Sequence, residues 1–264
     1  MRFRPHAIGR FGAGVSLLLA NVASAQELET ETARVIPSGY VKNGAGFEFQ
    51  TSSEGTESSV PTFVEVGFLD RLELVVEPVL LTAIRPKHGP SATGEGDLEL
   101  TLLGLVVHEQ PWFPALALAA EMKVPTARKP LIGTREYDYT GYLILSKRFG
   151  DLYLHLNGGY AVLGQPPGTQ VDNIFVFAAA AKYQATKRLD VFVEVLGDTS
   201  SMSEGQEEAD ASGASAELAG GELVGTVGAG YRIAKPILLS LGVSYDNNDA
   251  IIIHPGVTFE SQVF

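Results

Sequence analysis

The sequence predicts an all-β protein, a transmembrane antiparallel up-and-down β-barrel of about twelve strands. Three features of the chain lead to this prediction. Apolar and polar residues alternate with a period of two along most of its length, short connections alternate with longer ones, and a basic and then apolar segment opens the chain.

The first residues have the pattern of an export signal. Arg2, Arg4 and Arg10 precede the apolar run 11–20, and the small residues 23–25 occupy the positions expected for cleavage. We therefore predict that residues 1–25 are a signal peptide of the Gram-negative secretory type. Residues 26–264 would form the barrel, with residues 26–43 as a short periplasmic segment before it.

The strands are expected wherever large apolar residues occupy every second position. In one such segment Leu189, Val191, Val193 and Val195 alternate with Asp190, Phe192 and Glu194. The lengths suit tilted strands of roughly 9–11 residues that cross a membrane. The segments run over 44–52, 59–69, 71–81, 96–107, 113–124, 137–148, 152–162, 173–184, 188–197, 221–233, 236–246 and 250–260.

The connections between these segments differ in length. Tight joints occur at 70, 150–151, 186–187 and 234–235, and a slightly longer one at 108–112. The intervening connections are 53–58, 82–95, 125–136, 163–172 and 198–220, and the short joint 247–249 is an exception. Short turns at one end and long loops at the other are typical of outer-membrane barrels. An even strand number places both termini at the short-turn end, which would face the periplasm.

The content of the two faces favours a membrane barrel over a soluble sandwich. The apolar face carries mainly Leu, Val and Ile, whereas the other face carries small residues and charges of both signs. Aromatic residues gather near the strand ends, as in interfacial belts: Phe68, Trp112, Phe113, Phe149, Tyr183 and Tyr231 by the tight turns, and Tyr139, Tyr160 and Tyr245 toward the loops. Pro78 and Pro255 fall inside expected strands, so each is expected to mark a rim position or a bulge.

Composition excludes several classes of function. The formal net charge of -12 argues against nucleic-acid binding, which needs clustered Lys and Arg. The absence of Cys excludes disulfides, thiolate metal sites, a Cys nucleophile and a lipid-modified cysteine. We expect no cofactor and no metal, and the expected partners are membrane lipid and a small-molecule solute.

Alternation assigns a set of charged and imidazole side chains to the lumen. As a hypothesis, the solute pathway would include Glu73, Glu99, Glu121, Lys123, His155, Lys182, Arg188, Glu194, Arg232 and His254, and the same pattern also points Glu65, Arg71 and Glu222 inward. The charges could line a selective pore or pair with one another to fill a narrow barrel. No Ser-containing motif accompanies the histidines, so we expect hydrogen-bonded lumen residues and no catalytic site. The acidic connection 198–220 is expected to be a solvated loop, with cation capture as the alternative.

Several motifs resemble a known family. They are Phe68–Leu74, Gly94–Leu98, Pro114–Leu118 with Lys123–Thr126, and Ser146–Asp151 leading to His155–Tyr160. In this order they resemble the outer-membrane MetA-pathway of phenol degradation proteins, often simply called transporters. The chain departs from the family pattern after Phe259, and whether Phe259 or Phe264 ends the barrel stays open.

The resemblance implies an outer-membrane barrel that moves small solutes, with aromatic or hydrophobic molecules as candidates. We therefore expect a passive, cofactor-free channel or transporter in the outer membrane and no enzyme activity. Two alternatives stay open: a lipid-modifying barrel enzyme, and a structural or adhesion barrel with a filled lumen.

Overall fold

The computed structural model describes residues 28, 30–167, 170–201 and 221–262. The expected signal peptide 1–25, most of the connection 198–220 and Phe264 lie outside these residues. The described part of the chain contains no helical segment with the length and apolar character needed to cross a membrane.

Its strands are β1 (Tyr40–Gly46), β2 (Glu48–Thr51), β3 (Gly55–Leu69), β4 (Leu72–Pro86), β5 (Ala92–Gly94), β6 (Leu98–Val107), β7 (Ala115–Val124), β8 (Asp138–Phe149), β9 (Leu152–Val162), β10 (Ile174–Gln184), β11 (Leu189–Asp198), β12 (Leu223–Ala234), β13 (Ile237–Asp246) and β14 (Ile251–Gln262).

The strands form a closed antiparallel barrel. Neighbours in sequence are neighbours in the sheet, and β14 closes the ring by pairing with both β1 and β2. Two strands are interrupted: β1 and β2 share the partners β3 and β14, and β5 and β6 share β4. Counting each interrupted pair once gives twelve strands, so the expected all-β up-and-down barrel is confirmed. In the part of the chain that the structure describes, closure joins the first and last of the twelve strands, and the short piece β5 at the long-loop end pairs with β4 alone.

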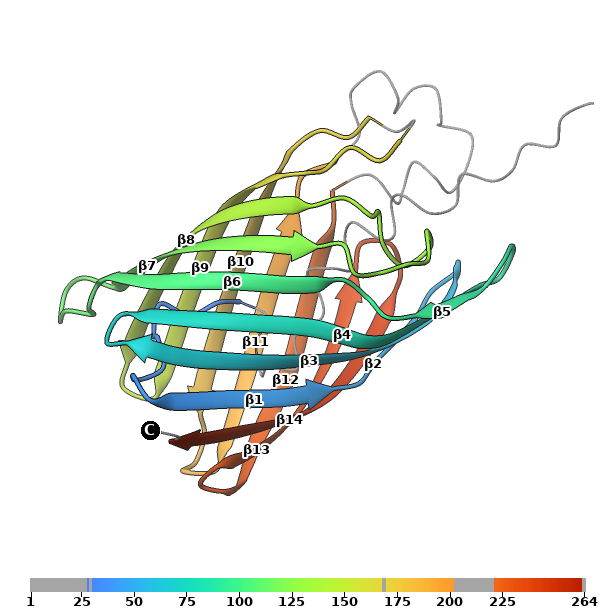
Figure 1. Ribbon diagram of the computed structural model, residues 1–264. Helices are drawn as coiled ribbons and strands as arrows, with labels where there is room; N and C mark the ends of the chain where they lie inside the picture. Colours follow the sequence, from blue (N-terminus) through green and yellow to red (C-terminus); the bar gives the residue numbers. More distant parts are fainter. Residues whose placement is uncertain (1–27, 29, 168–169, 202–220, 263–264) are drawn as a thin grey trace, which may run out of the picture.

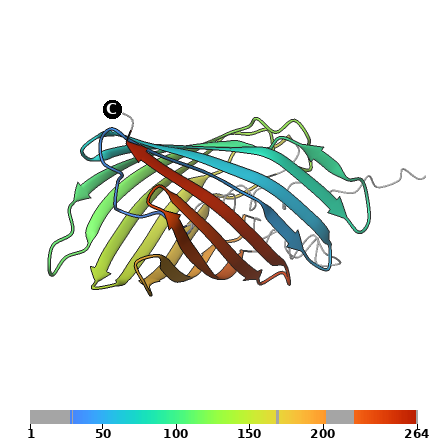
Figure 2. The ribbon, with the colours of Figure 1, turned by 90° about the horizontal axis from the view of Figure 1, so that it is seen from below.

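The two ends of the barrel differ. The connections β3–β4, β8–β9, β10–β11 and β12–β13 are tight, and Gly150 adopts the left-handed φ of 63° that the β8–β9 turn requires. Tyr40 pairs with Gln262 at this short-turn end, so the barrel's first and last strands meet there. The longer connections lie at the other end, and the strands between are strongly tilted (Figures 1 and 2).

The outward face of the barrel is apolar and the inward face is polar. On β13, Leu241, Val243 and Tyr245 are exposed, whereas Ser244 and Asp246, which alternate with them, are buried. The same contrast repeats around the ring, with exposed Leu, Val, Ile and aromatic side chains outside and buried Glu, Thr, Lys and His inside. A water-soluble protein buries its apolar rows, so this arrangement fits a barrel surrounded by hydrocarbon.

Irregularities in the wall coincide with the prolines. Near Pro78, β4 carries a bulge where Leu80 and Leu81 are both exposed in succession. Pro255 lies on β14 opposite the break between β1 and β2, and its carbonyl accepts a hydrogen bond from the Phe47 N–H at 3.0 Å. Proline has no backbone N–H to donate to the neighbouring strand, and a bulge or a strand break is where a sheet tolerates that missing hydrogen bond.

Candidate functional site

A segment before β1 lies inside the barrel. Three of its backbone N–H groups donate to side chains on the wall: Thr30 to Glu194 Oε1 at 2.5 Å, Ala33 to Ser146 Oγ at 2.8 Å, and Ile36 to Glu73 Oε2 at 2.7 Å. The Thr30 hydroxyl also donates to Glu194. Residues 30–37, which we call the lumen segment, are therefore held by three separate strands.

The lumen segment spans the interior of the barrel. Its anchors Glu194 and Glu73 lie on β11 and β4, which stand six strands apart in the ring of twelve, on opposite walls. Ser146 on β8 lies midway between them. The chain therefore crosses the lumen, and in Figure 1 it lies within the ring of strands before it enters β1.

An apolar patch on the inward face explains where the lumen segment packs. Ala33 is buried against inward side chains of β6, β7 and β8, and Val35 packs on the same cluster: Leu103, Leu105, Ala115, Ala117, Ala119 and Ile144. The small alanines of β7 leave the room that the chain occupies. On β3, Gly67 lies under the carbonyls of Ile36 and Pro37, where a Cβ would overlap the backbone. Burial of this patch stabilises the lumen segment against the wall.

One wall of the lumen carries a group of five glutamates. Glu65, Glu73, Glu77, Glu99 and Glu121 project inward from the adjacent strands β3, β4, β6 and β7, and Glu77 stands directly opposite Glu99. Lys42 Nζ donates to Glu65 at 2.7 Å, and Lys123 faces Glu99 across β6 and β7. This wall, which we call the acidic wall, combines several carboxylates with two lysines.

The loop between β7 and β8 packs against the wall at the long-loop end of the barrel. Lys123 forms ion pairs with Asp138 at 2.5 Å and Asp97 at 3.9 Å, and donates to Thr134 Oγ1 in this loop at 3.1 Å. The loop also covers inward apolar side chains of β4 and β5, in a cluster of Ile84, Ala92, Ala127 and Ile132. Lys123 therefore fixes the loop to the wall at the long-loop end.

The two predicted lumen histidines each contact a serine. His155 Nδ1 lies 2.8 Å from Ser146 Oγ, and His254 Nε2 lies 2.8 Å from Ser244 Oγ, which also contacts Thr226 Oγ1. Because Ser146 Oγ accepts the Ala33 N–H, its own proton is available to His155. Among the described residues neither histidine forms a hydrogen bond or an ion pair with a carboxylate, so the geometry lacks the third member of a hydrolase triad.

Inward rings lie flat on glycines of the neighbouring strand. The direct cross-strand pairs are Phe63 with Gly44, Tyr142 with Gly159, Phe192 with Gly228, and His254 with Gly242. A Cβ at any of these glycines would overlap the ring. Each glycine therefore lets a ring rest against the wall, so that it projects less into the lumen.

Most of the remaining predicted lumen residues lie near the short-turn end. Lys182 Nζ is 5.7 Å from the centre of the Tyr153 ring on the inward face. Arg188 and Arg71 are exposed in turns, and Arg232 is half-buried with its Nη1 donating to the Lys235 carbonyl at 3.1 Å. Glu222 is buried at the opposite, long-loop end. Arg71 and Arg188 therefore lie in turns and not on the inward strand face where they were expected, whereas the other predicted residues are distributed between the two ends of the barrel.

The lumen segment and the ring–glycine pairs were not found by sequence reasoning. The lumen segment has no strand alternation, and its anchors Glu194, Ser146 and Glu73 lie far from it in sequence. The row of inward alanines at 115, 117 and 119 was a signal that something packs there. Within the described residues, no group of three His, Asp or Glu side chains is placed to hold a metal ion.

Comparison with solved structures identifies similar barrels. The COG4313 outer membrane channel from Pseudomonas putida F1 superposes with a TM-score of 0.69 at 12% sequence identity, covering 89% of this chain and 100% of that one. The NanC porin gives a TM-score of 0.58 at 11% identity, covering 82% of this chain and 98% of that one. The KdgM porin in complex with disordered oligogalacturonate gives 0.54 at 10% identity, with 83% and 98% covered.

At these identities the comparisons show a shared fold. Neither a protein-family model nor a curated protein sequence matches the chain.

Proposed function

We propose that this protein is a passive, cofactor-free outer-membrane channel for small solutes. Its apolar exterior suits a bilayer, and its interior is polar. Because the wall is closed, the backbone N–H and C=O groups of the strands can hydrogen-bond to one another. The similar barrels are described as an outer membrane channel and as porins, which supports the same role here. The basic and apolar start of the sequence, read as a signal peptide over residues 1–25, supports export to the outer membrane.

The ring–glycine pairs carry this proposal. A barrel of about twelve strands lies between small barrels that their own side chains fill and large ones that stay open. Here four inward rings rest on glycines, and the inward rows of β7, β10 and β12 hold small residues such as Ala117, Ala178 and Gly230. Small and flattened side chains leave space along the axis, which a sealed structural barrel would not need.

The charges favour small polar or cationic solutes over purely apolar ones. The acidic wall presents several carboxylates along the path, and rings of such groups attract cations. The resemblance to MetA-pathway of phenol degradation proteins adds aromatic or hydrophobic solutes as candidates. Apolar clusters at the long-loop end, including Leu163, Val171 and Ile174, offer such molecules a first contact.

Planar-bilayer recording of the refolded protein tests the proposal. We expect discrete conductance steps, and a reversal potential in a KCl gradient that shows cation preference. Folding is checked separately by the shift in gel mobility that closed barrels show before and after boiling. A correctly folded protein that carries neither current nor solute flux would overturn the channel proposal.

A filled structural barrel is the second candidate, and the lumen segment favours it. Residues 30–37 join opposite walls and pack against the apolar patch, as a plug would. Removal of residues 26–37 discriminates the two: a plugged barrel begins to conduct only after the deletion, whereas a narrowed channel conducts before it as well.

A further inference from the structure

Positive charge gathers around one tyrosine at the short-turn end. The guanidinium carbons of Arg34 and Arg148 lie 5.2 and 5.0 Å from the centre of the Tyr153 ring, and Lys182 Nζ lies 5.7 Å from it. These cations come from the lumen segment, from β8 and from β10. Three cations that converge on one ring repel one another unless negative charge is close by.

One carboxylate belongs to this group. Glu109, in the β6–β7 turn, forms an ion pair with Arg34, accepts the Arg148 N–H at 2.9 Å and lies 3.5 Å from Lys147 Nζ. Desolvation acts to raise the pKa of Glu109, but the Arg148 N–H and the charges of Arg34 and Lys147 outweigh it and hold this pKa below its ordinary value. The surroundings of Glu109 are therefore strongly favourable to negative charge.

The arginines also keep unused hydrogen-bond donors. Arg34 donates to Glu109 through Nη2, and Arg148 donates to the Gly150 carbonyl through Nε at 2.6 Å. Among the described residues nothing accepts from Arg34 Nη1 or from either Nη atom of Arg148. Guanidinium groups with free donors are suited to bidentate hydrogen bonds with carboxylate or phosphate.

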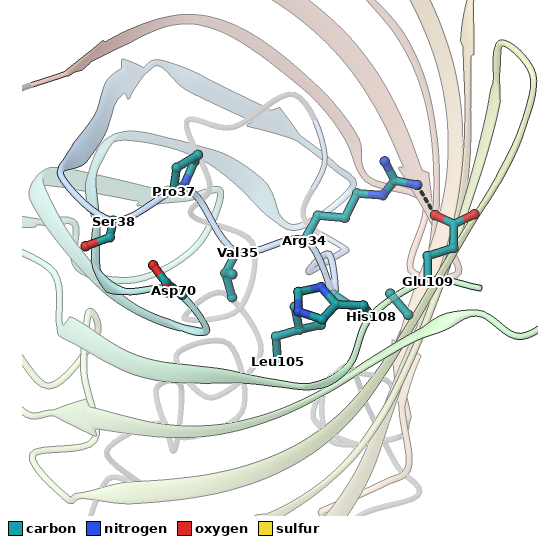
Figure 3. A pocket seen from close by; sticks show the side chains of 10 residues that line it. Arg34, Val35, Pro37, Ser38, Asp70, Leu105, His108 and Glu109 are labelled. Atoms are coloured by element: carbon teal, nitrogen blue, oxygen red, sulfur yellow. Dashed lines mark hydrogen bonds and ion pairs between the residues drawn. The ribbon is translucent and has the colours of Figure 1, made fainter.

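A cavity lies beside these donors. It has a volume of about 480 Å³ and is lined by Arg34, Glu109, Gln110, Pro111, Lys147, Arg148 and Gly150. A second cavity of about 480 Å³ shares Arg34 and Glu109 and runs between the lumen segment and the β3–β4 and β6–β7 turns. Figure 3 shows Arg34 reaching from the lumen segment to Glu109 at its edge. The Arg34–Glu109 ion pair therefore borders both cavities, one beside the arginines and one beside the lumen segment.

We propose that the cavity between Arg34 and Arg148 is a binding site for small oxyanions, meaning carboxylate or phosphate groups. The two guanidinium groups grip the anion, Tyr153 positions both of them, and Glu109 keeps Arg34 oriented. An anionic group that reaches the inner end of the acidic lumen is held here before release. The same chemistry fits the phosphate of a lipid headgroup at the rim, so the experiment separates a soluble anion from a lipid.

Calorimetric titration with inorganic phosphate tests the site without relying on conductance. The full barrel is refolded in dodecyl maltoside, which carries no phosphate, and titrated at fixed ionic strength. We expect saturable binding that Arg148→Gln weakens by about tenfold or more, because a hydrogen bond to a charged group is lost. Arg34→Gln combined with Arg148→Gln is expected to abolish it. Lys187→Gln, an exposed cation in the neighbouring β10–β11 turn, is the matched control and should bind as the parent does.

Two further arms sharpen the result. Arg148→Lys keeps the charge and loses the bidentate donors, so it should bind phosphate with intermediate strength. This single, charge-preserving variant also keeps the test interpretable if the double variant does not fold. Repetition with phosphatidylglycerol in the micelles identifies the source: loss of phosphate binding means that a lipid headgroup takes the site, and unchanged binding means a soluble anion. The absence of saturable binding, or equal affinities for Arg148→Gln and Lys187→Gln, would overturn the proposal even if the barrel conducts.

Discussion

Substitution of Gly228 by alanine probes whether the glycines keep the lumen open. Gly228 on β12 pairs directly with Phe192 on β11, and a Cβ there would overlap the Phe192 ring and contact the Leu241 carbonyl. The ring must therefore leave the wall and turn toward the lumen. Overpacking of this kind costs about 1–3 kcal/mol of folding free energy. We expect Gly228→Ala to lower both the single-channel conductance and the free energy of unfolding.

Gly225 supplies the matched control on the same strand. It faces outward with open space where a Cβ would stand, so Gly225→Ala should change neither quantity. Phe192→Ala should raise the conductance, and combining it with Gly228→Ala should relieve the overlap. The resulting double-mutant cycle should show a coupling of about 1–2 kcal/mol in urea unfolding. If Gly228→Ala and Gly225→Ala behave alike in both assays, the reasoning about flattened rings is wrong.

Four further predictions follow from the lumen. Deletion of residues 26–37 should raise the conductance measured in bilayers, because the lumen segment crosses the passage; unchanged conductance would contradict its placement. Lys123→Met should destabilise the barrel by roughly 3 kcal/mol or more in urea unfolding, because Asp97 and Asp138 then remain buried without their ammonium partner, whereas the exposed Lys187→Met should have little effect. The double variant Glu99→Gln and Glu121→Gln should reduce cation preference in the reversal potential, whereas Glu54→Gln at the exposed β2–β3 turn should leave it unchanged. The pKa of Glu109 is lowered in the folded protein, so the stability from its contacts with Arg34 and Arg148 is present above the ordinary carboxyl pKa and is lost as pH falls through the lowered value; acid unfolding of Glu109→Gln should lack this component.

The strands could be predicted because alternation and turn residues are local signals. Expected segments such as 152–162 and 236–246 match β9 and β13 at or within one residue of each end. The break at Phe47 and the separate short strand β5 were not predicted, because they depend on how β14 and β4 pair with their neighbours, whereas the expected segment 96–107 corresponds to β6. Ladder geometry of that kind involves partners that are distant in sequence.

The interior could be predicted only in part. Parity along each strand is enough to point Glu73, Glu121 and Glu194 inward, but it does not reveal what they bind. Glu73 and Glu194 accept hydrogen bonds from backbone N–H groups of the lumen segment. Backbone donors of this kind leave no side-chain pattern in the sequence. The same limit applies to the ring–glycine pairs, since a pair such as Phe63 with Gly44 exists only once the register of β1 and β3 is set.

Ring closure constrains the order in which this molecule can assemble. β14 must find β1 and β2 across nearly the whole described chain, and until it does, both free edges expose unpaired amides that hydrocarbon cannot solvate. The lumen segment runs directly into β1, and its three anchors belong to strands that come later in the chain. Those strands must therefore form before the lumen segment can make its three backbone hydrogen bonds inside the barrel.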